Sequence, residues 1–480
     1  MIELLCEGYE ASYELSNIIN LFLPYIKEPL ILQAIYEEEK AVARLKQEEA
    51  VLYEQVYPVD LLEDVIKDKK NIKEALKKAA YDVLVAYTGK TMPWGILTGI
   101  RPTKLVHEAI KEGLDDTAID AYLESAYKVS PNKRILMREV AKQELAILEK
   151  NEPGEVSVYI GIPFCPTRCV YCSFTAYSLE QKQKEVEPYL EALFKEITFV
   201  AESKKAKKIR SLYIGGGTPT SLNENQLERL LSHVEESFDL SQIEEYTLEA
   251  GRPDTITAEK LRIMKVHGVG RISINPQSMN QKTLDAIGRR HSVEDIKEVF
   301  RTAREIGHDN INMDMILGLP GETLEDVAYT LAELKKLGPE NITVHTMAIK
   351  RASRLKEALT SGEASIHLTE GEKIQEMLNL CEKEIGDMGL YPYYMYRQKN
   401  MLGNFENVGY AKPGTEGIYN IEIMEEAESI IALGAGAITK MVYQNGERID
   451  RIPNVKSLKD YIERIDEMIE RKREGFEKYQ

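Results

Sequence analysis

Between residues 156 and 347, six short apolar runs alternate with longer amphipathic segments, and this alternation constrains the fold more than any other feature. The runs are VSVYI from Val156, RSLYI from Arg210, EYTLEA from Glu245, RISIN from Arg271, NINMDMIL from Asn310 and NITVHTM from Asn341. Apolar runs of this length are typical of strands, and the segments between them repeat apolar residues at helical spacing. Strands that alternate with helices form βα units around a parallel sheet. The sequence therefore predicts an α/β domain of six βα units.

Three of the segments between the runs carry a signal for the start of a helix. In a capping box, a Ser or Thr before the helix and an acidic or amide side chain three residues later hydrogen-bond reciprocally with the backbone. The matching pairs are Ser221 with Glu224, Ser292 with Asp295, and Thr323 with Asp326. We expect a helix after each pair, and the third helix should end at Gly338-Pro339.

Glycines or polar residues follow each apolar run. In parallel barrels, the carboxyl ends of the strands meet at the face that carries the binding site. We therefore favour a curled sheet, a partial (β/α)6 barrel, over an open sheet, with a site at the carboxyl ends of its strands.

The sequence changes in character on both sides of this region. Residues 1–150 are rich in charge, and EEEKAVARLKQEEAV from Glu37 is typical of a helix with one solvated face. KNEPGEV from Lys150 has the composition of a boundary. After about residue 390 the alternation stops, and aromatic and glycine-rich stretches lead to a final amphipathic helix. We predict an accessory domain at 1–150, the barrel at 151–390, and a small C-terminal lid or helical domain at 391–480.

Charge and hydropathy limit the partners of the chain. Its formal net charge of −17 argues against broad electrostatic binding to nucleic acid. No apolar stretch approaches the ~20 residues of a membrane span. Met1 is followed by Ile2 and Glu3, not by the basic start and apolar run of a signal peptide. We expect a soluble, cytoplasmic protein.

Three of the five cysteines crowd into one short stretch, Cys165-x3-Cys169-x2-Cys172, directly after the first apolar run. An odd number of cysteines in a cytosolic chain makes a disulfide framework a poor explanation. Structural zinc normally takes four ligands, and no second Cys or His pair lies near. Iron–sulfur clusters also usually take four, but three would leave one iron of a 4Fe–4S cluster open for a small ligand. From the residues alone, zinc and such a cluster both remain open.

Six motifs, in order, resemble the oxygen-independent coproporphyrinogen III oxidase family of radical S-adenosylmethionine proteins. They are YIGIPFCPTRCVYC, LYIGGGTPTSL, TLEAGRPD, INPQSMN, GRRHS and NMDMILGLPGET. The resemblance covers about residues 155–440. The additional N-terminal region, with GILTGIRPTKL, resembles the coproporphyrinogen dehydrogenase branch of spore-forming and gut bacteria.

The resemblance implies both the cofactors and the reaction. Cys165, Cys169 and Cys172 would hold a 4Fe–4S cluster whose fourth iron chelates S-adenosylmethionine, and a donor such as flavodoxin or ferredoxin would supply the electron. Cleavage of S-adenosylmethionine then gives a 5′-deoxyadenosyl radical. Two propionates of coproporphyrinogen III would become vinyl groups, giving protoporphyrinogen IX in anaerobic haem biosynthesis. The cofactors carry this chemistry, while the protein positions them and excludes water and oxygen.

The resemblance also assigns contacts to S-adenosylmethionine. Arginine suits its carboxylate, Asp and Gln suit its ribose hydroxyls, and glycines allow close approach of the backbone. Any one of these residues alone would more often be a turn, a cap or a packing residue. The positions carried over are Tyr159, Tyr171, Gly216, Gly217, Thr218, Glu249, Gln277, Arg289 and Asp314, with Ile316 and Ala348, which match positions lining the adenosine, as weaker candidates.

Two departures from the family pattern leave the substrate open. The family's enzymes carry a fourth cysteine where this chain has Phe174, and a histidine where it has Gly161. Phenylalanine at the first position is shared with a related branch of haem-binding chaperones. That branch has a His-Asn motif in its C-terminal region, whereas no histidine follows His367 here. A haem chaperone and a radical enzyme acting on another tetrapyrrole are therefore the alternatives.

The four carboxylates of coproporphyrinogen III would require cationic partners. Candidates are Lys350, Arg351, Arg354, Arg397 and Lys399. His345 stands at the end of the sixth run, where a satisfied core histidine is the simplest interpretation.

Overall fold

The computed structural model describes residues 2–62, 64–99, 101–172, 176–349, 369–398, 401–443, 446 and 448–478. The chain forms two compact units: Met1–Ala141 with Gly403–Phe405, and Lys142–Leu402 with Glu406–Gln480. The predicted division into three domains stays a prediction. Among the described residues, no helix has the length and apolar character needed to span a membrane.

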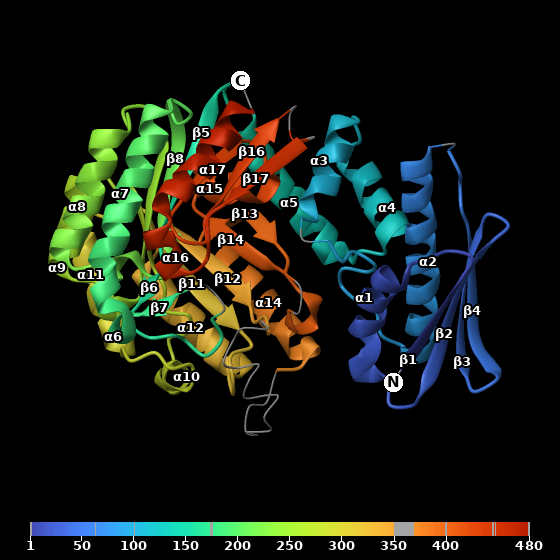
Figure 1. Ribbon diagram of the computed structural model, residues 1–480. Coiled ribbons are helices and arrows are strands. Elements are labelled where there is room, and N and C mark those ends of the chain that lie inside the picture. The colour runs from blue at the N-terminus through green and yellow to red at the C-terminus, as the bar shows by residue number, and fades with distance from the viewer. Residues whose placement is uncertain are drawn as a thin grey trace. The chain divides into compact units, whose positions relative to one another are not determined.

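The first unit contains a four-stranded sheet in the order β1-β2-β3-β4, drawn in blue in Figure 1. Its strands are β1 (Ile2–Glu7), β2 (Leu30–Glu37), β3 (Lys40–Gln47) and β4 (Ala50–Pro58). β1 is parallel to β2, and the other pairs are antiparallel. The helices are α1 (Ser12–Phe22), α2 (Val65–Thr88), α3 (Thr103–Lys111), α4 (Asp116–Tyr127) and the start of α5 (Pro131–Leu148). α1 and α2 pack together, and α2 packs on the sheet.

The predicted helix in the stretch from Glu37 is wrong, because these residues form β3 and the two turns that flank it. Glu38, Glu39 and Glu48 adopt positive φ angles of 46°, 56° and 53°, which reverse the chain at both ends of the strand. Ala43 and Leu45 are fully buried. Helix-forming residues dominate the stretch, but packing against the rest of the unit overrides a weak local preference.

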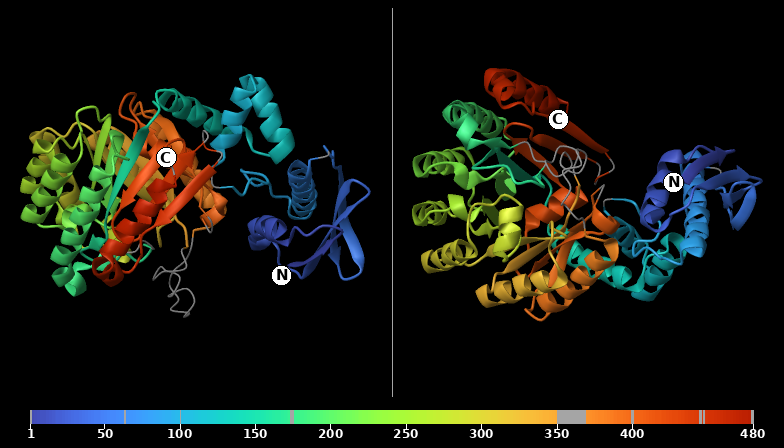
Figure 2. Two further views of the ribbon diagram at one scale, coloured as in Figure 1. Left: turned by 45° about the horizontal axis from the view of Figure 1, so that its top comes forward. Right: turned by 90° about the horizontal axis from the view of Figure 1, so that it is seen from below.

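The second unit is built on an eleven-stranded sheet, and its central six strands are parallel and follow chain order. They are β5 (Glu155–Ile162), β8 (Lys208–Gly216), β9 (Glu245–Gly251), β10 (Arg271–Ile274), β11 (Ile311–Leu317) and β12 (Asn341–Thr346). The crossover helices lie along the outer face of the sheet (Figures 1 and 2). They are α7 (Val186–Glu202), α8 (Glu224–Ser237), α9 (Ala258–Val266), α11 (Val293–Ile306) and α12 (Leu324–Leu337). The prediction of six βα units in a partial barrel is confirmed.

The segment after residue 390 extends this same sheet at both of its ends. Beside β12 lie β14 (Asn407–Ala411) and β13 (Tyr391–Tyr396), both antiparallel to their neighbours. Beside β5 lie β15 (Ser429–Leu433), which is parallel to it, and then antiparallel β16 (Ile438–Tyr443) and β17 (Arg448–Pro453). The remaining elements are β6 (Phe164–Cys165), β7 (Tyr177–Ser178), α6 (Leu179–Lys182), α10 (Gln281–Ala286), α14 (Gly371–Gly386), α15 (Ile418–Glu425), α16 (Leu458–Glu463) and α17 (Ile465–Glu477).

Two of the three predicted capping boxes are confirmed. Ser292 with Asp295 begins α11, and Thr323 with Asp326 begins α12, which ends before Gly338. The prediction for α8 is wrong by two residues, since Asn223 and Gln226 form its capping box. Ser221 instead belongs to a short 3-10 turn, where its hydroxyl donates to the carbonyl of Phe164 at 3.0 Å. This serine helps to hold the loop after β8 against the start of the cysteine loop.

A fully buried ion pair joins the final helix to the barrel. Lys472 on α17 contacts Glu196 on α7 at 2.7 Å, and both side chains are fully buried. Asn454 and Tyr461 donate to the same carboxylate at 2.7 and 2.6 Å, and the amide of Gly434 donates at 2.8 Å. Because both charges are compensated, this network ties the C-terminal helix, the end of β15 and the crossover helix after β5 into one body.

Candidate functional site

The three clustered cysteines lie in the loop at the carboxyl end of β5. Cys165 forms part of β6, and its Sγ lies 3.4 Å from the hydroxyl of Thr218. The amide of Cys172 donates to the carbonyl of Cys169 at 3.2 Å. Burial raises the pKa of Cys165 to about 11; the hydrogen bond from Thr218 opposes this shift, and the other two thiols add to it. Three thiolates on one loop repel one another unless a bound cationic centre holds them, and three soft donors on one loop suit an iron–sulfur cluster.

The glycine-rich loop after β8 packs directly on the backbone that leads into the cysteine loop. The amides of Gly217 and Thr218 donate to the carbonyls of Ile162 and Phe164, each at 2.8 Å. A Cβ at Gly217 would lie only 2.5 Å from the Phe164 carbonyl oxygen. Gly216 has a φ of +108°, which side chains rarely adopt. Glycine is therefore required here by close contact between two segments of the protein, whatever the loop also binds.

Glu249 and Tyr213 form a buried polar pair at the ends of β9 and β8. The Tyr213 hydroxyl donates to Glu249 at 2.5 Å. Burial raises the pKa of Glu249 to about 7, the hydrogen bond from Tyr213 opposes this, and the negative charge of Asp314 adds to it. A Cβ on Gly215 would lie 2.9 Å from the second carboxylate oxygen. The absence of a side chain at Gly215 leaves room for that oxygen.

Gln277 and Asp314 are fixed to each other through their backbones. The Gln277 amide donates to the Asp314 carbonyl at 2.9 Å, and the Ile316 amide donates to the Gln277 carbonyl at 3.0 Å. Gln277 has a φ of +67°. The strand order and these bonds bring Asp314 on β11 next to Gln277, which follows β10, as both were predicted to belong to the site.

The Asp314 carboxylate is held from two sides. Asn312 donates to one oxygen at 2.7 Å, and His345 Nε2 lies 3.7 Å from the other. Burial alone would raise the pKa of Asp314, but the hydrogen bond and charge of His345, together with Asn312, lower it overall. Tyr396 places its hydroxyl 3.4 Å from His345 Nδ1. His345 has polar partners on both ring nitrogens, as expected of a satisfied histidine, but a quarter of its side chain is exposed, so it is not a core residue.

Two buried arginines approach the cysteine loop. Arg289 donates to the carbonyl of Asn275 and, at 3.3 Å, to the hydroxyl of Tyr171. The structure thus brings together two predicted contacts, Arg289 and Tyr171. Arg252, which the sequence reasoning missed, lies beside Cys169. Its position in TLEAGRPD, at the end of the third run, was the available signal.

Three tyrosines, from β5, β8 and α15, stack against one another. The rings of Tyr213 and Tyr419 are the closest pair, with centroids 4.5 Å apart, and the ring of Tyr159 lies beside both, 6.3 Å from Tyr213 and 6.0 Å from Tyr419. Tyr419 comes from α15, where no sequence signal links it to the site. A Cβ at Gly161 would lie 3.3 Å from the ring of Tyr159 and 3.4 Å from the carbonyl of Leu433. The histidine that the family carries at this position would therefore require its neighbours to move.

The remaining predicted residues are less informative. Ala348 follows β12 and bridges to Met401. Arg397 is 3% exposed; burial lowers its pKa to about 10, and Glu406 opposes this shift. Phe174, Lys350, Arg351, Arg354 and Lys399 lie outside the described residues.

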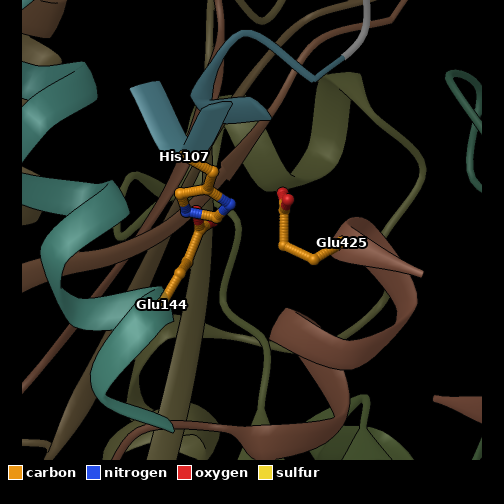
Figure 3. A group of neighbouring side chains, drawn as sticks. All are labelled: His107, Glu144 and Glu425. Atoms are coloured by element: carbon orange, nitrogen blue, oxygen red, sulfur yellow. The ribbon is translucent and has the colours of Figure 1, made fainter. Parts of the chain in front are cut away.

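Two acidic side chains of the second unit stand apart from this site. Figure 3 shows Glu144 on α5 and Glu425 at the end of α15, and also His107, which belongs to α3 of the first unit. None of the three lies in the cysteine loop or at the carboxyl ends of the six parallel strands. We therefore do not include them in the candidate site.

Comparisons with known proteins agree with this geometry. Residues 159–334 match the Radical SAM superfamily. The chain is 42% identical over 84% of its length to the oxygen-independent coproporphyrinogen-III oxidase-like protein HemZ of Bacillus subtilis, and it covers 81% of that protein. It is 33% identical over 65% of its length to the heme chaperone HemW of the same organism, and it covers 76% of that protein.

One solved structure shares the architecture of the barrel. The coproporphyrinogen III oxidase HemN of Escherichia coli, described as a radical SAM enzyme, superimposes with a TM-score of 0.52 and 24% identity. The match covers 68% of this chain and 73% of that one. It supports the partial barrel that the strand order shows.

Proposed function

Because this chain belongs to the radical S-adenosylmethionine family of coproporphyrinogen III oxidase-like proteins, whose cofactors are a 4Fe–4S cluster and S-adenosylmethionine, we propose that it is an oxygen-independent coproporphyrinogen III dehydrogenase. Each of two propionates of coproporphyrinogen III would give a hydrogen atom to the 5′-deoxyadenosyl radical, release carbon dioxide and pass one electron to an external acceptor, and so become a vinyl group. The observation that carries the proposal is the three-cysteine loop at the carboxyl end of β5, in a chain 42% identical to HemZ over most of both lengths.

Cys165, Cys169 and Cys172 would hold the cluster in this proposal. The donor set fits, because all three cysteines stand on one loop and none of them forms a disulfide. When bound, the cluster and S-adenosylmethionine supply the organic radical that takes hydrogen from an unactivated carbon. Flavodoxin or ferredoxin is the proposed class of electron donor.

The surrounding side chains would bind and orient S-adenosylmethionine. Arg289 is 6% exposed and presents a rigid fork suited to its carboxylate. Asp314, whose carboxylate is fixed by Asn312 and His345, would accept hydrogen bonds from ribose hydroxyls. Gln277 stands beside Asp314, and the turn at Gly216, Gly217 and Thr218 would face the same ligand. These assignments use residues that the fold already holds in place.

The stacked tyrosines would close the barrel below the reacting groups. Tyr159, Tyr213 and Tyr419 place three aromatic rings side by side, and Tyr213 also fixes Glu249. An apolar floor of this kind excludes water from a radical reaction.

Haem binding without decarboxylation is the second candidate. The 33% identity to HemW supports it, and so does the phenylalanine at position 174. The lack of any histidine after His367 argues against a haem ligand in the C-terminal region. A radical enzyme for another tetrapyrrole is the remaining alternative.

Product analysis separates these functions. The cluster would be reconstituted without oxygen, and reductant, S-adenosylmethionine and coproporphyrinogen III added before mass spectrometry. We expect protoporphyrinogen IX together with 5′-deoxyadenosine, and neither product from Cys169→Ala. Cys381→Ala, a buried thiol on α14, is the matched control and should keep both products. 5′-Deoxyadenosine without vinyl product would contradict the substrate, and stoichiometric haem binding without turnover would favour the chaperone.

A further inference from the structure

Arg252 is a buried cation beside the cysteine loop to which the proposed function assigns no role. The side chain follows β9 and is 3% exposed. Its Nη1 donates to the carbonyl and hydroxyl oxygens of Thr167 at 3.1 and 2.8 Å. The same nitrogen lies 4.0 Å from the Sγ of Cys169. One guanidinium edge is therefore directed at the backbone and a sulfur of the loop.

The opposite edge of this guanidinium is clamped by Asp254. Nε donates to one carboxylate oxygen at 2.9 Å and Nη2 to the other at 2.6 Å, which is a bidentate pair. His291, which is 2% exposed, places Nδ1 3.5 Å from Asp254. The hydroxyl of Thr255 donates to the Arg252 carbonyl at 2.8 Å. Side chain and backbone are both fixed, so the guanidinium cannot swing away from the loop.

A fixed cation in this place acts on any redox group that the thiols hold. Charges interact more strongly in a protein interior than in water. A thiolate-bound cluster becomes more negative when it is reduced, so a nearby cation stabilises the reduced form more than the oxidised form. Hydrogen bonds to the sulfurs and the local charge are known determinants of cluster potentials. Asp254 partly offsets the effect, but it sits on the far edge of the guanidinium.

We propose that Arg252 is a positioning residue that fixes the cysteine loop and raises the reduction potential of the cluster held by Cys165, Cys169 and Cys172. This inference rests on the proposed function, because it requires the cluster at these cysteines. Asp254 tunes the same potential in the opposite direction. Arg289 remains on the loop through Tyr171 when Arg252 is replaced, so cluster assembly does not depend on Arg252 alone.

The test compares cluster potentials in four proteins of full length: wild type, Arg252→Met, Asp254→Asn and the control Arg262→Met. Arg262 forms an exposed ion pair with Glu259 on α9 and is the matched surface arginine. Iron and sulfide would be quantified first, and the midpoint potential then measured by anaerobic titration followed by electron paramagnetic resonance. At the midpoint potential of the wild type, we expect the ratio of reduced to oxidised cluster in Arg252→Met to be at least tenfold lower than in the wild type. For a one-electron couple, this corresponds to a midpoint potential about 59 mV lower.

The other variants make the test decisive. Asp254→Asn should shift the midpoint upward, because it removes the opposing charge and keeps the arginine, and Arg262→Met should leave it unchanged. A wild-type midpoint in an iron-replete Arg252→Met protein would overturn the inference. If Arg252→Met does not retain iron, a midpoint for Asp254→Asn at or below that of wild type would overturn it equally. Absence of a cluster in the wild-type protein would instead refute the proposed function.

Discussion

Replacing Gly217 by alanine should disturb the candidate site through the protein backbone, without removing any polar group. The new Cβ would lie 2.5 Å from the Phe164 carbonyl oxygen, about 0.9 Å short of ordinary contact at 3.4 Å. The neighbour is backbone, and the 2.8 Å bonds from the amides of Gly217 and Thr218 hold the two segments together. Relief therefore requires the loops to separate.

Separation of the two loops lowers the stability of the protein in two ways. Overpacking a rigid site by one methyl group costs about 1–3 kcal/mol. Lengthening one buried hydrogen bond removes about 0.5–1.5 kcal/mol more. We expect Gly217→Ala to lower the free energy of unfolding of the second unit by about 1.5–4.5 kcal/mol. Iron content should also fall, because Phe164 immediately precedes Cys165.

Urea unfolding followed by far-ultraviolet circular dichroism provides the assay. Tryptophan fluorescence would report on the wrong unit, because the chain's one tryptophan is Trp94. Gly386→Ala is the matched control: this residue ends α14, and a Cβ added to it would meet no heavy atom of the described chain within 4 Å. It should be neutral or stabilise by about 0.5–1 kcal/mol. Wild-type stability and iron content in Gly217→Ala would refute the reasoning.

Three further predictions concern the buried charges of the second unit. Lys472→Met leaves Glu196 buried without its cation and should lower the free energy of unfolding, measured in urea, by about 3–5 kcal/mol. A decrease of less than about 1 kcal/mol would contradict a buried ion pair. Asp314→Asn should weaken S-adenosylmethionine binding at least tenfold in an anaerobic titration with iron content unchanged, and equal affinity would count against the contact. Burial raises the pKa of Glu249 to about 7, above its usual 4.5, so its contribution to stability is present below pH 4.5 and lost as the pH rises through 7. When the pH is raised from 5.5 to 7.5, the free energy of unfolding of the wild type should fall by about 1–2 kcal/mol relative to that of Glu249→Gln. If the difference in free energy of unfolding between the two proteins stays constant over this range, the raised pKa is refuted.

Sequence periodicity predicted the barrel well because its strands are buried on both faces. The six runs from Val156 to Asn341 became the six parallel strands in order, since continuous apolar runs between amphipathic helices have few other solutions. The first unit was mispredicted at Glu37, because the positive φ angles at Glu38 and Glu39 carry no glycine or asparagine signal.

The candidate site was predictable where motifs end strands and unpredictable where side chains arrive from elsewhere. Cys165 and Gln277 follow the carboxyl ends of β5 and β10, and Asp314 lies on β11, all in the parallel sheet whose topology brings them to one region. Tyr419 reaches the site from α15, and Arg252 reaches Cys169 through a bend after β9. Contacts of this kind depend on tertiary packing and leave no local spacing in the sequence.

The most direct test of the central claim follows one hydrogen atom. Coproporphyrinogen III deuterated on its propionate side chains would be turned over without oxygen. The 5′-deoxyadenosine formed would be isolated, and its deuterium content measured by mass spectrometry. Radical decarboxylation predicts that deuterium passes from the propionate into 5′-deoxyadenosine, and that vinyl product accumulates with it. Vinyl product accompanied by unlabelled 5′-deoxyadenosine would contradict hydrogen abstraction from the propionate. Absence of vinyl product would contradict the proposed substrate itself.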